Sequence, residues 1–222
     1  MRIAVYSGSF NPLHIGHLSI MKYLTEKAGY DCVYLVVSPK NPLKDSISAD
    51  SAEERFQAAI QAVARHPELR VKVDDIELTL PPPQYTIRTL DELRRRERDN
   101  EFTLVMGGDN LQGLRRWRDY RRILSEYGVV VFPRDGIDLE AIRDSLLEEC
   151  ASLPSSLTQD TEVHLDEEGT DQIVSPDRRG FENVGEGMYK IRLLLDAPRV
   201  DVSSSMIREG LKKGEDMSRY LM

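Results

Sequence analysis

The segment that most constrains the fold is Gly8–His17, GSFNPLHIGH, which joins a predicted strand to a predicted helix. Residues 2–6 form a short apolar run typical of a buried strand, and apolar residues recur at helical spacing from Leu18 to Leu24. Glycine and proline in the connection favour a turn in which the backbone comes close to another group. A helix N-terminus presents unpaired N–H groups and a partial positive charge, so this turn is a candidate phosphate site.

The turn differs from two common phosphate-binding motifs. It has neither the spacing G-x-G-x-x-G nor the spacing G-x-x-x-x-G-K-S/T. A purely structural interpretation stays open, in which glycine and proline only shape the turn and one histidine caps the helix. Two histidines three residues apart, together with Asn-Pro and two glycines, favour the functional interpretation, with His14 and His17 as its candidate residues.

The composition indicates one soluble globular domain over residues 1–222, with 40% hydrophobic and 31% charged residues. No apolar run approaches the ~20 residues that span a membrane. The chain enters a predicted strand at once, which leaves no room for a signal peptide. Cys32 and Cys150 are too few for a disulfide framework, so we expect a cytoplasmic location. The net charge of −8 argues against a nucleic-acid surface but not against a local phosphate site.

Strand-like and helix-like segments alternate, which predicts an α/β fold with a mostly parallel sheet. A capping box at Ser51 and Glu54 opens one helix, with Phe56, Ala59, Ile60 and Val63 on its inner face. Asp138 is expected to cap another helix, and the arginines 94–96 are expected on a solvated face. The predicted strands are residues 2–6, 32–37, 71–73 with 76–78, 102–106, 129–132, 189–195 and a strand end at 200–202. The predicted helices follow residues 17, 51, 85, 110, 138 and 203, the fourth of them running from 111 to 127.

Residues 151–187 differ in character from the rest of the chain. Serine, threonine, aspartate, glutamate and glycine dominate there, and the hydrophobic periodicity disappears. A segment of this length without periodicity is unusual inside a compact domain. We therefore expect a flexible acidic insertion or lid within the domain.

Polar, glycine-rich or basic residues follow five of the predicted strands. In open α/β sheets, ligands bind beyond the carboxyl ends of the strands, so these segments should meet in one cleft. The segments are Gly8–His17, Ser38–Lys44, Gly107–Asn110, Arg134 and Ser203–Arg208.

The last of these segments has the form of an anion cradle. Ser203, Ser204 and Ser205 offer hydroxyls and free N–H groups at a helix start, and Arg208 lies one turn further on. A plain helix cap would need only one serine, and that simpler interpretation stays open.

Two of these segments together resemble a known family. GSFNPLHIGH resembles the first signature of the nucleotidyltransferase superfamily, and VSSSMIREG at 202–210 resembles the ISSTxIR signature of bacterial nicotinate (or nicotinamide) mononucleotide adenylyltransferases. HIGH also occurs in class I aminoacyl-tRNA synthetases, but their KMSKS signature is absent and the chain is too short. The resemblance implies a doubly wound, Rossmann-like sheet with helices on both faces and a small C-terminal portion carrying Ser203–Arg208.

Three further segments match that family. Ser38–Lys44 resembles the loop that ends in a phosphate-contacting lysine, and Gln84–Thr86 resembles its (S/T)YT element. Met106–Asn110 followed by Trp117 resembles its GxDN…W element, in which the indole ring stacks on the nicotinate base. Position 11 is Asn where many relatives carry Asp, and the chain ends at 219–222 where relatives usually continue through a proline into a final helix.

The resemblance implies adenylyl transfer from ATP to nicotinate mononucleotide in NAD biosynthesis, with deamido-NAD and pyrophosphate as products. It assigns catalysis to His14, His17, Lys44 and Arg208. It implies ATP contacts from Gly8, Ser9, Phe10, Gly16, Asp109, Arg134, Ser203, Ser204 and Ser205, and mononucleotide contacts from Asn11, Tyr85, Thr86, Gly107, Asn110 and Trp117. Mg²⁺ would arrive with ATP rather than bind a dedicated carboxylate site. Asp109 would orient substrate or a metal-bound water.

Two alternatives stay open at this point. Pantetheine-phosphate adenylyltransferase shares HxGH, but that family is shorter and lacks the YT…GxDN…W set; cytidylyltransferases, which carry a different second signature, are more distant. A non-catalytic nucleotide sensor with the same fold is the alternative from another class. The sequence does not decide between nicotinate and nicotinamide, and it is compatible with a homo-oligomer.

Overall fold

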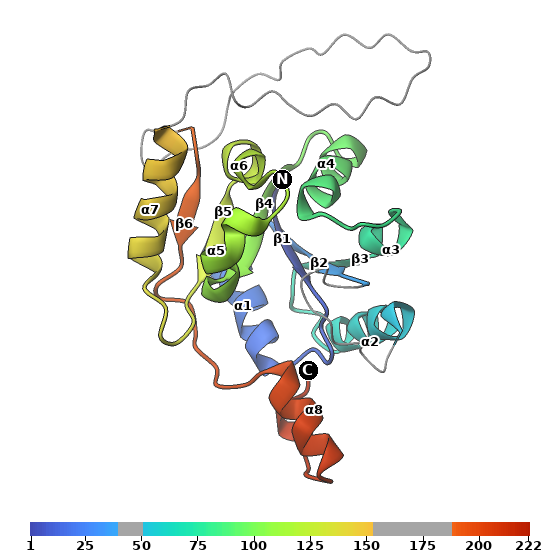
Figure 1. The fold of residues 1–222 in the computed structure, drawn as a ribbon. Helices are drawn as coiled ribbons and strands as arrows, with labels where there is room; N and C mark the ends of the chain where they lie inside the picture. Colours follow the sequence, from blue (N-terminus) through green and yellow to red (C-terminus); the bar gives the residue numbers. More distant parts are fainter. Residues whose placement is uncertain (40–50, 153–187) are drawn as a thin grey trace.

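The computed structural model describes residues 1–39, 51–152 and 188–222. In this part of the chain the centre of the fold is a six-stranded sheet in the order β3-β2-β1-β4-β5-β6 (Figure 1). Every pair of neighbouring strands is parallel, which confirms the predicted α/β, doubly wound class. The strands are β1 (Arg2–Gly8), β2 (Cys32–Val37), β3 (Val71–Asp74), β4 (Glu101–Gly107), β5 (Val129–Phe132) and β6 (Ile191–Leu193).

Helices connect the strands and cover the sheet. Two predicted caps are confirmed: Ser51 and Glu54 form a reciprocal capping box, and the Asp138 carboxylate accepts the N–H of Ala141 at 3.0 Å. The helices are α1 (Ile15–Glu26), α2 (Ala52–Ala64), α3 (Ile76–Thr79), α4 (Thr86–Arg96), α5 (Gly108–Gly113), α6 (Tyr120–Arg122), α7 (Leu139–Ala151) and α8 (Ser204–Lys212). Single turns occur at η1 (Leu114–Arg116), the π-helical η2 (Ile123–Tyr127) and η4 (Ser218–Tyr220).

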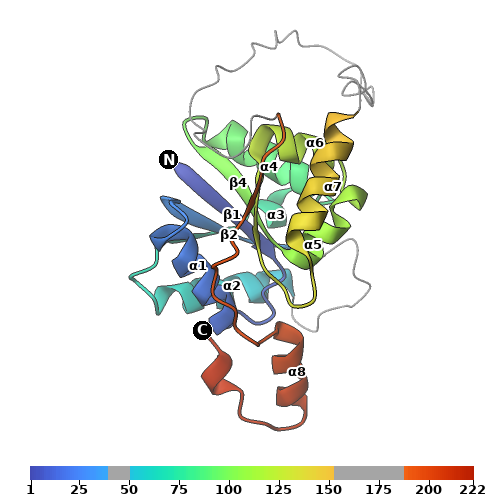
Figure 2. The same cartoon turned by 90° about the vertical axis from the view of Figure 1, so that its left-hand side faces the viewer.

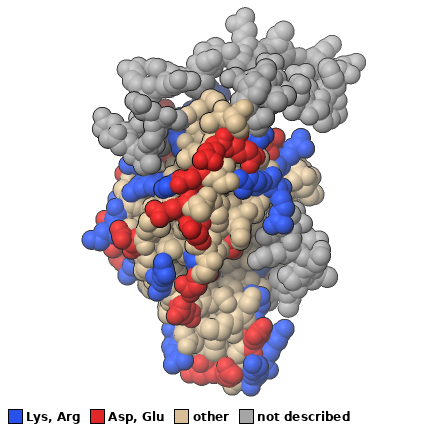
Figure 3. Space-filling view, turned by 60° about the vertical axis from the view of Figure 1, so that its left-hand side comes forward, with Lys and Arg blue, Asp and Glu red and all other residues tan. Residues whose placement is uncertain are grey.

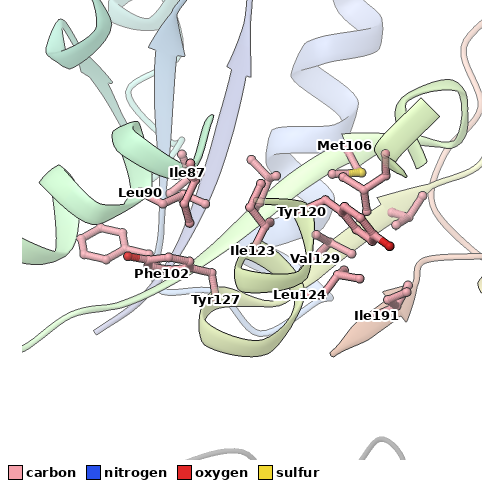
Figure 4. Close-up of a cluster of buried hydrophobic side chains, with 14 of the residues drawn as sticks. Ile87, Leu90, Phe102, Met106, Tyr120, Ile123, Leu124, Tyr127, Val129 and Ile191 are labelled. Carbon is pink, nitrogen blue, oxygen red and sulfur yellow. The ribbon is translucent and has the colours of Figure 1, made fainter. Parts of the chain in front are cut away.

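The two faces of the sheet carry separate hydrophobic clusters. Because successive side chains of a strand point to opposite faces, Ile3 and Val5 of β1 belong to one cluster, and Ala4 and Tyr6 belong to the other. The first cluster packs beneath α3–α7, and its centre is drawn in Figure 4. The second packs beneath α1 and α2, which lie on the other side of the sheet in Figure 2.

The strand order places two sequence motifs side by side. β1 lies between β2 and β4, and Tyr6 of β1 is paired with Val105 of β4. The helices that follow β1 and β4 go to opposite faces, which opens a crevice at the carboxyl ends of these strands. Gly8 and Gly107 are the last residues of the two strands. The helix α8 lies beyond the same ends, at the bottom of Figure 1.

Residues 76–78 do not form the predicted strand. The chain turns into the short helix α3, and the Asp74 carboxylate accepts the N–H of Ile76 at 3.2 Å at that turn. The alternation of apolar and polar residues in this stretch therefore does not reflect a strand, because the residues form a partly buried helical turn. The predicted strand at 189–195 is shorter, at Ile191–Leu193, and residues 200–202 form no strand.

The predicted helix at 111–127 is also wrong as a single element. The chain forms α5 and η1, breaks at Trp117–Asp119, and resumes as α6 and η2. Asp119 adopts a left-handed conformation with φ 51°, which a continuous right-handed helix excludes. Trp117 lies at the break and is partly exposed, whereas a single helix would have buried one continuous face.

Three of the four residues predicted for the inner face of α2 are confirmed, because Ala59 is buried and Phe56 and Val63 pack against the second cluster. The buried residues of α2 are Arg55, Ala59 and Ala62, whereas Ile60 is 39% exposed. The arginines at the end of α4 are less simply solvated than expected, because Arg96 pairs with the buried carboxylate of Asp74.

The predicted insertion at 151–187 lies outside the described residues except for its first two. Among the described residues, none of the helices is both long and apolar enough for a membrane span. On the face drawn in Figure 3, basic and acidic side chains are interspersed.

Candidate active site

His14 and His17 form a stacked pair at the start of α1. Their ring centroids are 3.7 Å apart with 31° between the planes. His14 is the N-terminal cap residue of the helix, and its backbone N–H donates to Nδ1 of His17 at 3.2 Å. Because Nδ1 of a neutral His17 is then the acceptor, its proton lies on Nε2. The turn therefore gives His17 one fixed N–H donor.

Aromatic rings hold His17 in place. Phe10 packs edge-on against the His17 ring at 5.2 Å and against Tyr6 at 5.4 Å. Phe10 itself adopts a left-handed backbone conformation with φ 42°, which is strained for a side chain of this size. Gly8 makes room for it, since a Cβ at Gly8 would lie 3.1 Å from the Phe10 ring. The turn thus places its aromatic side chain beneath the histidine pair.

Both histidines are held neutral in the unliganded protein. Burial and the positive charge of Arg134 lower the pKa of His14 to about 4. Burial, the neighbouring His14 and Arg134 lower the pKa of His17 well below its usual value. Within the described part of the chain, the buried Nδ1 of His14 has no hydrogen-bond partner. A buried polar atom without a partner is costly, which is typical of an atom that a ligand satisfies.

The two histidines line a cavity of about 250 Å³. Its walls combine four segments: the end of β1, the start of α1, the residues after β5 and the residues before α8. Of the residues predicted from the sequence, it brings together His14, Gly16, His17, Arg134 and Ser203. Sequence reasoning missed the other lining residues, which include Tyr6, Phe132, Asp135, Arg199 and Asp201.

Gly16 lies between the His14 ring and the residues that precede α8. A Cβ at Gly16 would lie 3.0 Å from Nδ1 of His14 and 3.3 Å from Val202. These contacts are tighter than ordinary van der Waals separations, so a glycine here permits the histidine stack and the approach of the segment before α8.

Helix α8 is fastened to the Gly8–His17 turn. Ser204 donates to the carbonyl oxygen of Pro12 at 3.0 Å, and Arg208 donates to that of Asn11 at 2.5 Å. Arg208 also donates to the Ser205 hydroxyl at 3.0 Å. The two signatures that lie about 190 residues apart in sequence therefore form one unit.

Of the three serines at 203–205, only Ser203 caps helix α8 with its side chain. Ser203 accepts the N–H of Met206 at 3.1 Å and caps α8, which confirms the predicted helix start. Ser205 is exposed and Ser204 half-buried. The run is thus more than a helix cap, because Ser204 binds the turn.

The end of β4 faces the end of β5. Asp109 lies 3.8 Å from Arg134, and the Arg134 guanidinium lies over the Phe132 ring. A Cβ at Gly107 would lie 2.5 Å from the Asp109 carboxylate, so only glycine leaves this carboxylate in place. Asp109 is connected in this way to the cavity wall through Arg134.

The residues expected to contact the mononucleotide lie outside the cavity lining. Tyr85 is the cap residue of α4, and Thr86 begins the helix. Tyr85 and Trp117 are both partly buried and pack against the first hydrophobic cluster. Asn110 is exposed in α5. Lys44 lies outside the described residues.

Arg55 supports two loops at the carboxyl end of the sheet, and the sequence analysis missed it. It is 4% exposed and donates to the carbonyl oxygens of Ser9 at 2.6 Å, Ser38 at 2.9 Å and Pro39 at 3.0 Å. It therefore ties the loop after β1 to the loop after β2. Its position in the buried stripe with Ala59 and Ala62 is a sequence signal, because an arginine on an apolar helix face needs buried partners.

The carboxylate supply for a metal is small. The described residues contain no group of three or more His, Cys, Asp or Glu side chains placed to hold a metal ion. Asp109 is one carboxylate beside the cation of Arg134.

Comparison with known proteins shows the family to which this chain belongs. Residues 5–210 match the family described as cytidylyltransferase-like. The probable nicotinate-nucleotide adenylyltransferase of Flavobacterium psychrophilum is 41% identical over 221 residues, which cover 100% of this chain and 92% of that protein. The protein of the same name from Bacteroides fragilis is 32% identical over 99% of this chain and 87% of its own.

A solved structure gives the same fold. Nicotinic acid mononucleotide adenylyltransferase of Plasmodium falciparum, complexed with NaAD, aligns with a TM-score of 0.67 over 99% of this chain and 90% of that chain. Its sequence is 14% identical, so this likeness concerns the fold alone. The family match and the relatives together show that the chain belongs to the cytidylyltransferase-like family and, within it, to the nicotinate-nucleotide adenylyltransferases.

Proposed function

We propose that this protein transfers the adenylyl group of ATP to nicotinate mononucleotide and releases pyrophosphate. The observation that carries the proposal is the histidine pair at the start of α1, which faces a cavity that is also lined by Arg134 and Ser203. The names of the relatives favour the same reaction. In this reaction a 5′-phosphate oxygen of the mononucleotide attacks the α-phosphorus of ATP. The bond from that phosphorus to the bridging oxygen breaks, and pyrophosphate leaves with the electron pair.

His14 and His17 would act at the α-phosphate. The Nε2–H of His17 is a fixed donor, and the buried Nδ1 of His14 has no hydrogen-bond partner among the described residues. Negative charge grows on the α-phosphate and bridging oxygens in the transition state, and preoriented donors stabilise that charge. A neutral imidazole suffices as a donor, and the polyphosphate charge would raise the lowered pKa of both rings on binding.

The C-terminal helix and Lys44 would hold the outer phosphates. Ser203, Ser204 and Ser205 lie at the N-terminal end of α8, where N–H groups and the helix dipole favour anions. Arg208 would exchange its contact with the Asn11 carbonyl for a phosphate oxygen. Gly8, Ser9, Phe10 and Gly16 would let the backbone approach the phosphates, and Arg134 would lie beside the nucleotide.

The mononucleotide would occupy the side of the crevice next to β4 and α4. We propose that Tyr85 and Thr86 contact it at the start of α4, and that the Trp117 ring stacks on the base. Gly107, Asn110 and Asn11 would complete this half of the site. Asp109 would orient substrate or a water on the Mg²⁺ that ATP brings.

We further propose nicotinate as the preferred base and the cytoplasm as the location. Both cysteines are free, Cys150 buried and Cys32 half-buried, which suits a reducing compartment. The preference for nicotinate is supported by the names of the relatives.

The test is a pyrophosphate-release assay with ATP and three acceptors in parallel. Nicotinate mononucleotide should give the highest kcat/KM, nicotinamide mononucleotide a lower one and phosphopantetheine none above background. Highest turnover with phosphopantetheine would favour a pantetheine-phosphate adenylyltransferase. Tight ATP binding without turnover of any acceptor would favour a nucleotide sensor.

A further inference from the structure

A buried carboxylate, Glu77 of α3, has no role in the reaction described above. It is 4% exposed, and its Oε1 accepts hydrogen bonds from the hydroxyls of Ser7 at 3.2 Å and Thr89 at 3.0 Å. The Ser7 hydroxyl lies 2.9 Å from that of Ser38. This cluster, Ser7–Ser38–Glu77–Thr89, joins the ends of β1 and β2 to helix α4.

On one side the cluster contacts α4 near its start, through the hydroxyl of Thr89. Thr89 is 1% exposed, and its backbone N–H donates to the carbonyl oxygen of Tyr85 at 3.2 Å. Residues three apart on a helix share a face, so Thr89 lies next to Thr86. The hydrogen bond to Glu77 therefore anchors α4 one turn beyond Tyr85 and Thr86.

On the other side the cluster holds the strand end that leads into the phosphate turn. Ser7 directly precedes Gly8, the last residue of β1. The backbone N–H of Ser38 donates to the carbonyl oxygen of Gly8 at 2.9 Å. Glu77 thus contacts the strand end that leads into the histidine segment and, through Thr89, the helix that begins with the residues expected to bind the mononucleotide.

The energetic cost of burying Glu77 indicates that this carboxylate fixes the positions of its neighbours rather than adding to the stability of the fold. Burying a carboxylate is costly unless hydrogen bonds compensate, and an apolar side chain of similar size would cost less. Burial raises the pKa of Glu77, and the hydroxyls of Ser38, Thr89 and Ser7 oppose that rise. An oxygen that accepts from two elements at once gives them a fixed relative position, which an apolar side chain would not.

We propose that Glu77 is a positioning residue for the mononucleotide half of the site. It holds the first turn of α4, and with it Tyr85 and Thr86, at a fixed place relative to the end of β1. The inference rests on the proposed function, in which Tyr85 and Thr86 contact the mononucleotide.

The experiment compares Glu77→Met, Glu77→Gln and Thr89→Val, with both substrates varied in the pyrophosphate-release assay. Glu77→Met keeps the side-chain length and removes the acceptor, so the KM for nicotinate mononucleotide should rise about tenfold, the worth of one hydrogen bond. The KM for ATP should stay within about twofold. Glu77→Gln retains the accepting oxygen and should restore the wild-type KM. Thr89→Val removes the donor and should reproduce the effect of Glu77→Met.

Asp74→Asn is the matched control. Asp74, three residues before Glu77, is also buried, at 3% exposure. It accepts hydrogen bonds from Arg96 and from the N–H of Ile76. It should lower the Tm without changing the ratio of the two KM values.

Three results would overturn the positioning role in an active enzyme: equal changes of both KM values in Glu77→Met, no change in either, or a wild-type KM in Thr89→Val. If Glu77→Met does not fold, Thr89→Val decides. Absence of turnover by the wild type would instead refute the proposed function, and it is measured first for that reason.

Discussion

The backbone N–H of His14 donates to Nδ1 of His17, and the two imidazole rings stack 3.7 Å apart. One local bond thus fixes the tautomer of His17 and the separation of two rings that face the same cavity. Stacked rings that share a buried site cannot both carry charge cheaply, which is one reason why the pKa of His17 is low. Under the proposed function, their contribution before ATP binds is oriented N–H donors rather than positive charge.

The lowered pKa of His14 makes stability depend on pH in a defined direction. Its value is about 4 in the folded protein against 6.5 for an ordinary histidine. The unfolded chain therefore takes up a proton first as the pH falls, and stability present above pH 6.5 is lost between pH 6.5 and 4. Between its ordinary and its folded pKa the wild type should lose about 3 kcal/mol, so His14→Gln should lose about 6–12 °C less in Tm over this range. Parallel Tm curves for the two proteins would contradict the assignment.

Arg55 should be essential for the geometry of both phosphate-side loops. Arg55→Lys cannot donate to three carbonyl oxygens with the same planar geometry, so kcat/KM for ATP should fall about 10–100-fold. Arg192→Lys is the matched control, because Arg192 also donates to a carbonyl oxygen, that of Ala28, at 2.8 Å outside the site. A loss in the control as large as in Arg55→Lys would show that arginine–carbonyl bonds matter only for folding.

Trp117 should contribute to the binding of one substrate only, nicotinate mononucleotide. Trp117→Ala removes the proposed stacking surface and should raise the KM for nicotinate mononucleotide about tenfold, with little change in the KM for ATP. Trp117→Phe keeps a flat ring and should recover most of the loss. Equal effects of Trp117→Ala on both KM values would remove Trp117 from the base pocket.

Local patterns in the sequence predicted the central elements correctly. The turn at Gly8–His17, the capping box at Ser51 and the serine cap of α8 depend on residues within a few positions of one another. The strand cores are continuous apolar runs, which a sheet buried on both faces requires. These features suffice for the fold class and the family.

The missed residues depend on distant partners. Arg55 binds a carbonyl oxygen 46 positions away, and Glu77 binds a hydroxyl 70 positions away, so no local pattern identifies the partner of either residue. Glu77 was also hidden by an apparent strand alternation at 76–78. The break at Asp119 comes from a left-handed backbone conformation, which the predicted continuous helix did not include. What the sequence conceals in this protein is therefore mainly its long-range polar contacts, together with the local breaks at 76–78 and at Asp119.

The most direct test of the account is the steady-state kinetics of His17→Ala with ATP and nicotinate mononucleotide. Loss of the oriented Nε2–H should lower kcat at least ~100-fold and leave both KM values nearly unchanged, as expected for a contact made in the transition state. Near wild-type kcat in this variant would contradict the assignment of the histidine pair to the α-phosphate.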